Sequence, residues 1–204
     1  MIAIIDYGLG NIRAFANVYK NLNIPHKIAS KSEDLKNVTK IILPGVGAYD
    51  YAMEQIQKSG MQEILNDLVL YRKIPVLGVC VGMQMLAMSS EEGSLSGLGW
   101  IDGVVKIFDT SELAHGTLLP HMGWNSISPT RDDKLFYGLG IGSRFYFLHS
   151  YYIHCLRDDD IVAVTDYGGL FTCAINSGNI YGVQFHPEKS HQNGIQLLKN
   201  FGML

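Results

Sequence analysis

A cysteine with a glycine two residues away on each side is the strongest chemical signal in this chain. Cys80 lies in Gly78-Val79-Cys80-Val81-Gly82, after the apolar run 74–77 and before the helix-like segment 83–88. This is the thiol version of the G-x-S-x-G nucleophile elbow, in which a strand turns sharply into a helix and exposes one side chain. The helix N-terminus would favour a thiolate and aim the Val81 amide at an oxyanion. The pattern alone also fits a buried structural turn.

A cysteine nucleophile needs a base, and the base needs a group that orients it. Among the seven histidines, His186 is distinguished by its context, because it follows a strand-like segment and precedes Pro187-Glu188. Proline restricts the backbone of the residue before it. The Glu188 carboxylate is near enough to bond the imidazole and fix its tautomer. A strand-end histidine beside a surface glutamate is the non-catalytic alternative.

A second glycine-flanked position follows another expected strand, in Leu43-Pro44-Gly45-Val46-Gly47. The two glycines permit a peptide flip that would aim the Val46 amide at an oxyanion. An ordinary glycine-rich turn is the alternative for this loop.

The elements that must hold these groups differ between the two halves of the chain. In the first half strand and helix signals alternate, with strands expected at 2–6, 26–29, 40–43 and 75–79 and helices at 11–22 and 49–71, the second broken near residue 60. The second half has short β-rich segments at 100–108, 124–128, 145–152, 161–165, 172–175 and 180–184, then a helix at about 193–201. We therefore predict an α/β fold: a mostly parallel central sheet with helices on both faces and added antiparallel strands in the second half.

Length and composition restrict the function classes. The 204 residues are 47% hydrophobic and show no repeat or linker, so we expect a single domain, 1–204, with one core. A net charge of -3 with scattered lysines and arginines argues against a nucleic-acid or membrane surface. The chain has no apolar stretch of membrane-spanning length, and its first residues read as a strand instead of a signal peptide. A cytoplasmic location follows as the expectation.

The cysteines and glycines also bear on cofactors. The three cysteines, Cys80, Cys155 and Cys173, are odd in number and widely spaced, which disfavours a disulfide framework or a zinc cluster. Gly8-Leu9-Gly10 follows the first strand, but Arg13 holds the third glycine position of a dinucleotide fingerprint and no acidic residue ends the second strand. We expect neither a cofactor nor a metal.

Taken together and in order, these motifs resemble those of class I, triad-type glutamine amidotransferases. The motifs are Pro44-Gly45-Val46-Gly47, Gly78-Val79-Cys80-Val81-Gly82-Met83-Gln84 and Gly182-Val183-Gln184-Phe185-His186-Pro187-Glu188. A narrower resemblance, to glutaminase subunits of imidazole glycerol phosphate synthases, rests on 6–11, 120–125, 147–152 and 187–190. The resemblance spans nearly the whole chain and implies a flavodoxin-like arrangement of the sheet.

The resemblance implies a glutaminase mechanism at these positions. Cys80 would attack the side-chain amide of L-glutamine to form a γ-glutamyl thioester, His186 would act as acid and base, and Glu188 would orient His186. The amides of Val46 and Val81 would form the oxyanion hole. The implied glutamine-binding residues are Gly45, Gly47, Gln84, His149, Ser150 and Tyr151.

The resemblance further implies a partner. Ammonia would pass to a (β/α)₈ synthase subunit, in a heterodimer that makes imidazole glycerol phosphate and the AICAR by-product in histidine biosynthesis. The implied partner-facing residues are Asn11, His121, Trp124, Asn125 and Lys189. An exposed tryptophan with polar neighbours is a common interface anchor, although a core aromatic is the alternative for Trp124.

Other readings remain open at the level of sequence. Residues 99–101 and 109–117 depart from the commonest form of the family and resemble paralogues that supply ammonia for sugar amidination in surface polysaccharide biosynthesis. A non-catalytic scaffold is disfavoured because Cys80, His186 and Glu188 are all intact. A cysteine peptidase of related architecture is disfavoured by the Pro-Glu after His186 and by the glycine pair around Val46.

Overall fold

The computed structural model describes residues 1–109 and 118–204, so most of the divergent 109–117 tract lies outside the described residues. Its central sheet has eight strands in the order β2-β1-β3-β4-β13-β12-β11-β8. The first five are parallel: β2 (His26–Ala29), β1 (Ile2–Ile5), β3 (Lys40–Gly45), β4 (Val76–Cys80) and β13 (Ile180–Val183). The last three are antiparallel: β12 (Leu170–Ser177), β11 (Ile161–Asp166) and β8 (Ser128–Pro129). The predicted mixed sheet is confirmed, and its parallel part has the flavodoxin-like order.

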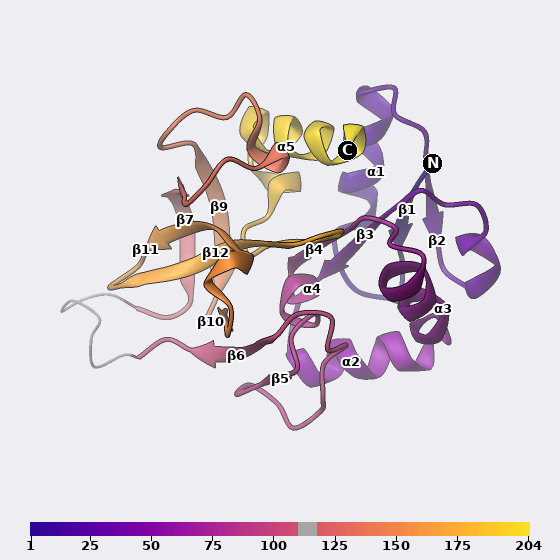
Figure 1. Ribbon diagram of the computed structural model, residues 1–204, viewed down its shortest axis with the longest axis horizontal. Coiled ribbons are helices and arrows are strands. Elements are labelled where there is room, and N and C mark those ends of the chain that lie inside the picture. Colours follow the sequence, from indigo (N-terminus) through magenta and orange to yellow (C-terminus); the bar gives the residue numbers. More distant parts are fainter. Residues whose placement is uncertain (110–117) are drawn as a thin grey trace.

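Helices cover both faces of this sheet, as predicted (Figure 1). α1 (Ile12–Asn21) and α5 (His191–Met203) lie on one face, and α2 (Tyr49–Lys58) and α3 (Gln62–Asn66) lie on the other. A π-helical turn, Asp67–Tyr71, extends α3 toward β4. Every residue of β1 and of β4 is buried, which explains why these strands read as continuous apolar runs.

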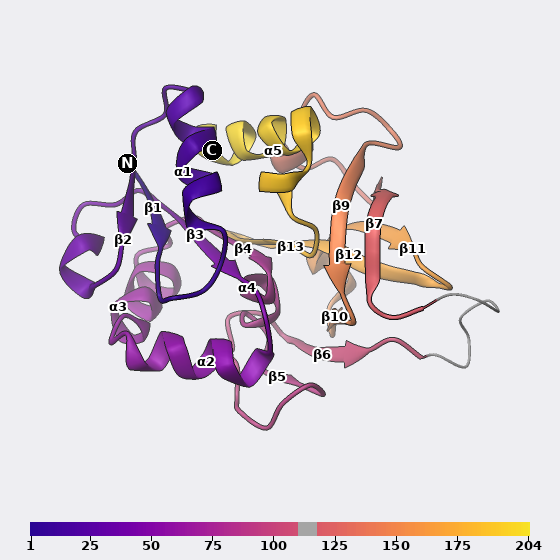
Figure 2. The ribbon, with the colours of Figure 1, turned by 180° about the vertical axis from the view of Figure 1, so that it is seen from behind.

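The second half adds two small sheets beside the antiparallel end of the central one. One has the order β10-β6-β5, from Tyr151–Cys155, Gly103–Ile107 and Ser89–Ser90. The other pairs β7 (His121–Ser126) with β9 (Arg144–His149), and Figure 2 shows this pair standing next to β12 and β11. The single strand expected at 145–152 is therefore two strands, because the chain changes sheets at Ser150.

The helix expected at 83–88 is shorter than predicted. α4 spans Val81–Gln84, and the following amides of Leu86 and Ala87 bond three residues back, to Met83 and Gln84. The carbonyl of Leu86 accepts from the amides of Trp100 and Ile101, so it is taken by a distant segment instead of a next helical turn. Four 3₁₀ turns complete the described elements: Ser32–Leu35, Lys134–Phe136, Asp158–Asp160 and Pro187–Lys189.

One hydrophobic cluster extends from Ile2 to Phe201 and includes residues of both halves of the chain. This continuity supports the expected single domain. Within the two described ranges, no helix has the length and apolar character that a membrane span needs.

Candidate active site

Three neighbouring parallel strands end at the same edge of the sheet, and a residue predicted to do chemistry lies at or just after the end of each strand. Gly45 of β3 pairs with Cys80 of β4, and Val183 of β13 pairs with Val79. Val46, Cys80 and His186 therefore converge from positions far apart in the sequence. The carboxyl edge of a parallel sheet is the usual location for a ligand site in this fold class.

Cys80 has the strained backbone of a nucleophile elbow. Its φ of 55° and ψ of -115° place a non-glycine residue in the left-handed region, which costs on the order of 1–3 kcal/mol and persists only where the surroundings enforce it. The enforcing contact is with the end of β3. A side chain at Gly82 would collide with the carbonyl oxygen of Leu43, and one at Gly45 would collide with the backbone of Gly82. The Cys80 thiol therefore lies on a turn at the end of β4 that packs tightly against the end of β3.

A buried His–Glu pair faces the thiol. His186 Nδ1 lies 3.0 Å from Glu188 Oε1, with side chains 3% and 1% exposed. Burial by itself lowers the pKa of His186, but hydrogen bonds and charge from Cys80 and Glu188 outweigh burial and raise the pKa to about 10. The other carboxylate oxygen, Oε2 of Glu188, is buried with no hydrogen-bond partner among the described residues. The carboxylate therefore acts on the imidazole alone, and the structure brings the predicted triad together.

A cavity of about 280 Å³ opens over these groups. Its lining residues are Val46, Gly47, Cys80, Val81, Gln84, Glu92, Pro120, Leu148, His149, Ser150, Tyr151, His186 and Lys189. Five of the six residues predicted to bind glutamine line this cavity. The sixth, Gly45, lies beneath it, buried against the elbow.

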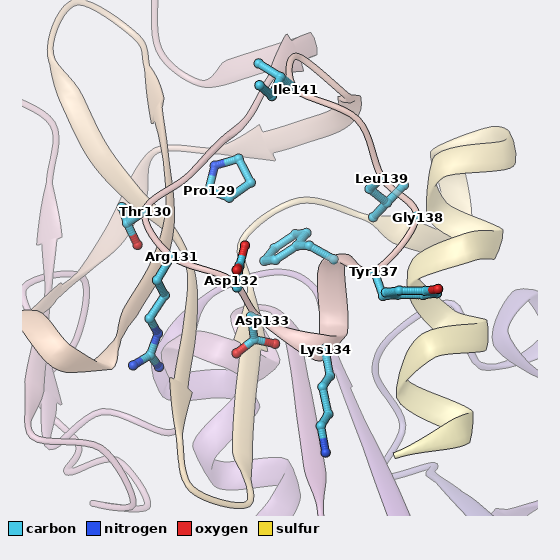
Figure 3. Close-up of a pocket in the computed structure, with 11 residues that line it drawn as sticks. Pro129, Thr130, Arg131, Asp132, Asp133, Lys134, Tyr137, Gly138, Leu139 and Ile141 are labelled. Carbon is cyan, nitrogen blue, oxygen red and sulfur yellow. The ribbon is translucent and has the colours of Figure 1, made fainter.

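A larger hollow of about 880 Å³ lies elsewhere, under the segment that leads from β8 to β9 (Figure 3). Arg131, Asp132, Asp133 and Lys134 contribute to its wall, together with Tyr137 and apolar side chains. Its lining residues include neither a cysteine nor a histidine. This hollow therefore lacks the nucleophile and base that the smaller cavity holds.

Gln84 is buried at the floor of the cavity, and internal bonds already hold its amide nitrogen. Gln84 Nε2 donates to the Tyr151 carbonyl at 3.0 Å and to Gln184 Oε1 at 3.1 Å. A bound ligand would therefore meet an amide whose orientation is fixed.

Two histidines form a buried, neutral relay behind the cavity. His149 Nδ1 lies 2.8 Å from the Tyr151 carbonyl oxygen, His149 Nε2 lies 3.1 Å from His121 Nδ1, and His121 Nε2 lies 3.3 Å from Asn125 Nδ2. A carbonyl only accepts, so His149 must donate through Nδ1 and His121 must donate to His149. Burial lowers the pKa of His149 to about 3 and that of His121 to about 4, so both rings are uncharged at neutral pH.

This relay changes the expected roles of its members. His149 lines the cavity, but both ring nitrogens are engaged, so its side chain positions Tyr151 and has no N–H left for glutamine. The prediction that the side chain of His121 faces a partner is wrong, because that side chain is 3% exposed and stacked between the rings of Phe147 and Tyr167. The amide nitrogen of Asn125 is likewise used internally, by His121 and by the Asp166 carbonyl. The alternation along β7 explains this, since His121 and Asn125 face inward while Trp124 faces outward.

The remaining predicted partner-facing residues do reach the surface. Asn11 and Lys189 are exposed, and Lys189 Nζ lies 5.9 Å from the ring centroid of Tyr146. Trp124 is 38% exposed, which excludes the core-aromatic reading, and its ring stacks on His191 at 5.1 Å with the planes 1° apart.

Glu92 is a cavity residue that the sequence analysis missed. Its Oε2 accepts from the Tyr49 amide at 3.1 Å, and burial raises its pKa. Asp50 holds the adjoining turn, because its carboxylate accepts from the amides of Ser94 and Leu95. The acidic pair Glu91-Glu92, which follows the elbow closely in the sequence, could have suggested a carboxylate in the cavity. No spacing rule, however, indicates which of the two side chains points into the cavity.

The fold and the elbow with its buried His–Glu pair define a triad-type amidohydrolase, and comparison with known proteins specifies it further. The chain belongs to the class-I glutamine amidotransferase family, whose model matches residues 3–203, and within that class to the HisH subunits. The imidazole glycerol phosphate synthase subunit HisH of Leptospira interrogans is 55% identical over the full length of both chains. The protein of that name from Bdellovibrio bacteriovorus is 56% identical over 98% of both chains. Among solved structures, a glutamine amidotransferase that is 20% identical shares the fold, with a TM-score of 0.74 over 98% of both chains.

Proposed function

We propose that this chain is the glutamine-hydrolysing subunit of an imidazole glycerol phosphate synthase and releases glutamate and ammonia from L-glutamine. The observation that carries the proposal is the Cys80–His186–Glu188 arrangement at the floor of a cavity sized for a small molecule. The names of its full-length relatives support the choice of pathway.

The reaction follows from the chemistry of the three residues. The Cys80 thiolate attacks the carboxamide carbon of glutamine, and the tetrahedral oxyanion lies between the amides of Val46 and Val81. When the C–N bond breaks, protonated His186 gives its proton to the departing ammonia. His186 then takes a proton from water, the hydroxide attacks the thioester, and the thiolate leaves as glutamate forms. Glu188 stabilises the imidazolium at each stage.

The cavity also provides for the amino-acid head of the substrate. Glu92 is the one carboxylate residue among the described residues that line the cavity, and it is not part of the triad. We therefore assign Glu92 to the ammonium group of glutamine. Ser150 and Tyr151 would contact the carboxylate end of the head group, and Gly45 and Gly47 keep the loop around Val46 narrow enough for close approach.

The second part of the proposal is a partner subunit that receives the ammonia. Ammonia in neutral water is mostly ammonium, which is not a nucleophile, so a sealed route to an acceptor is needed. The outward face of β7 and β9 presents Met122, Trp124 and Leu148, and Leu148 also lines the cavity. We assign this face, with Asn11 and Lys189, to a (β/α)₈ cyclase subunit in a heterodimer.

The alternative functions have less support. A paralogous sugar-amidination system would keep the same glutaminase chemistry, but the full-length relatives are named as subunits of imidazole glycerol phosphate synthase. Membership of the amidotransferase family argues against a peptidase, and the assembled triad argues against a scaffold. A cytoplasmic location fits the three free cysteines, Cys80, Cys155 and Cys173.

The test is glutamate release from glutamine by the purified chain, alone and with a cyclase subunit plus its ribonucleotide ligand. We expect slow release alone and strong stimulation in the complex, with imidazole glycerol phosphate and AICAR as products. The C80A variant should fold and bind the cyclase but release no glutamate. Rapid release by the chain alone would contradict the gating, and an absence of stimulation with Cys80 still alkylatable would favour the sugar-amidination partner.

A further inference from the structure

Gln184 is a buried polar residue that the mechanism above leaves unused. It follows β13 directly, its side chain is 0% exposed, and its Nε2 lies 3.7 Å from the Sγ of Cys80. Its backbone amide donates to the Cys173 carbonyl at 2.9 Å, which ties the residue to β12. A fully buried amide in contact with the reacting sulfur calls for a chemical explanation.

The orientation of this amide follows from its neighbours. The Tyr151 carbonyl is an obligatory acceptor, so the group of Gln84 that bonds it must be the NH₂. The same NH₂ bonds Gln184 at 3.1 Å, and that contact therefore requires the carbonyl oxygen of Gln184. The amide nitrogen of Gln184 is left facing Cys80, with an N–H directed at the sulfur.

Besides His186, the sulfur has two polar neighbours, the Leu148 carbonyl and the Gln184 amide, and these favour different protonation states of Cys80. The Leu148 carbonyl oxygen, 3.8 Å away, accepts a hydrogen bond from the neutral thiol. The N–H of Gln184 bonds most strongly to a thiolate, because a hydrogen bond to a charged acceptor in a buried site is about twice as strong as one to a neutral acceptor. An N–H held beside the sulfur therefore lowers the cost of forming the nucleophile.

We infer that Gln184 is a further catalytic residue, whose side-chain N–H stabilises the Cys80 thiolate before it attacks and again when it leaves the thioester. Gln84 is the positioning residue that holds the Gln184 amide in the required orientation. The thiolate part of the inference concerns the free protein, whereas the part about turnover rests on the proposed glutaminase function.

The experiment measures the rate at which iodoacetamide alkylates Cys80 as a function of pH in two variants. Gln184→Glu removes the amide donor but keeps an acceptor for Gln84, and Gln184→Met removes both groups at similar volume. We expect the pH of half-maximal alkylation to rise by about one unit in both variants, which is about tenfold in rate near neutral pH. In the complex, kcat should fall by a similar factor while KM stays within about twofold, because the bond is to the nucleophile and not to glutamine.

The matched control is Gln57→Glu, which makes the same amide-to-acid change at an exposed position of α2 and should leave the alkylation profile unchanged. Folding of each variant is checked by circular dichroism and thermal unfolding. A wild-type alkylation profile in folded Q184E and Q184M would overturn the inference. If the wild type released no glutamate but the variants still shifted the profile, the proposed function would fail and the role of Gln184 in thiolate formation would stand.

A measurement on the wild-type chain covers the case in which neither variant folds. The ¹⁵N-labelled side-chain amide of Gln184 is followed by NMR before and after alkylation of Cys80. We expect a change in the chemical shift of the hydrogen facing the sulfur, since alkylation turns the thiol into a thioether that can no longer ionise to a charged acceptor. An unchanged side-chain resonance would overturn the inference.

Discussion

At the residue scale, the site depends on how Glu188 changes the protonation of His186. The folded pKa of His186, about 10, lies above the ordinary imidazole value because Cys80 and Glu188 together outweigh burial. A raised pKa stabilises the folded state while the ring is protonated. This contribution is complete below about pH 6.5, the unfolded value, and is lost as the pH rises through the folded pKa.

The variant Glu188→Gln removes the negative charge beside the His186 ring. Loss of the charge should lower the pKa of His186, so the stability that depends on its protonation should disappear at a lower pH than in the wild type. The measurement is the ¹⁵N NMR titration of His186 together with urea unfolding at about pH 7 and about pH 9. Alkylation of Cys80 near neutral pH should also slow, because an imidazolium is the natural partner of a thiolate.

The control for this experiment is Glu33→Gln, at an exposed carboxylate in the first 3₁₀ turn, which should leave the titration of His186 unchanged. A His186 pKa that is the same in E188Q and in the wild type would show that Glu188 acts only in packing.

At the element scale, the elbow holds its shape because β4 and α4 pack directly on the end of β3. Gly82 has no space for a side chain, since the Leu43 carbonyl and the backbone at Pro44 lie against it. A clash with backbone is not relieved by a rotamer change, so the strands or the elbow must move apart.

We therefore predict that Gly82→Ala destabilises the protein by on the order of 2–4 kcal/mol and abolishes glutamate release. Urea unfolding measures the first effect and a glutamate assay the second. Gly140→Ala is the control, because Gly140 is exposed with nothing near its Cβ direction, and we expect a change within about 0.5 kcal/mol. Equal stability of the two variants would mean that the elbow can relax.

The β7–β9 pair should make the fold sensitive to acid. The pKa values of His149 and His121, about 3 and about 4, lie below the ordinary value because of burial. A depressed histidine pKa gives stability that is complete above about pH 6.5 and is lost as the pH falls toward the folded values. Protonation would also break the relay, because a charged ring has no acceptor nitrogen for its neighbour.

The urea midpoint should accordingly fall between about pH 7 and about pH 4.5 in the wild type. His121→Phe, which keeps the aromatic stack but removes one titrating ring, should reduce this pH dependence. His154→Gln, at an exposed position of β10, should leave it as it is. An equal loss of stability on acidification in wild type and H121F would place the acid sensitivity elsewhere in the chain.

At the scale of the whole molecule, the cavity and the proposed partner face are continuous. Leu148 contributes its carbonyl to the surroundings of Cys80 and its side chain to the outer face of β9. A partner covering this face would therefore seal the mouth of the cavity as well as dock.

Trp124→Ala should weaken binding of the cyclase subunit by on the order of tenfold to a hundredfold. An exposed tryptophan that becomes buried when a partner binds is a frequent interface anchor. The rate of Cys80 alkylation in the free chain should not change. Calorimetric titration measures the affinity, and Tyr71→Ala is the control, because Tyr71 is 80% exposed and precedes the amino end of β4, at the opposite edge of the sheet. Unchanged affinity in W124A would move the docking face away from β7.

Features that depend on neighbours along the chain could be predicted from the amino-acid sequence. The elbow around Cys80 and the His186-Pro187-Glu188 turn are local patterns of glycine, proline and strand ends, so their geometry could be predicted. The oxyanion role of the Val46 loop stays a prediction. The parallel half of the sheet was predictable for the same reason, because buried strands alternating with amphipathic helices leave a periodic signal. The length of α4 was not, since the Trp100 segment decides where that helix ends.

Contacts between polar groups that are far apart in the sequence depend on how the chain packs in three dimensions. His121 contacts His149 because the register of β7 and β9 sets them opposite each other. His121, which was expected at the partner interface, is therefore buried and belongs to the histidine relay. Gln84 and Gln184 meet across 100 positions in the sequence, and Glu92 enters the cavity from a loop held by Asp50. Hydrogen bonds of this kind require packing and strand register, for which no spacing in the sequence is diagnostic.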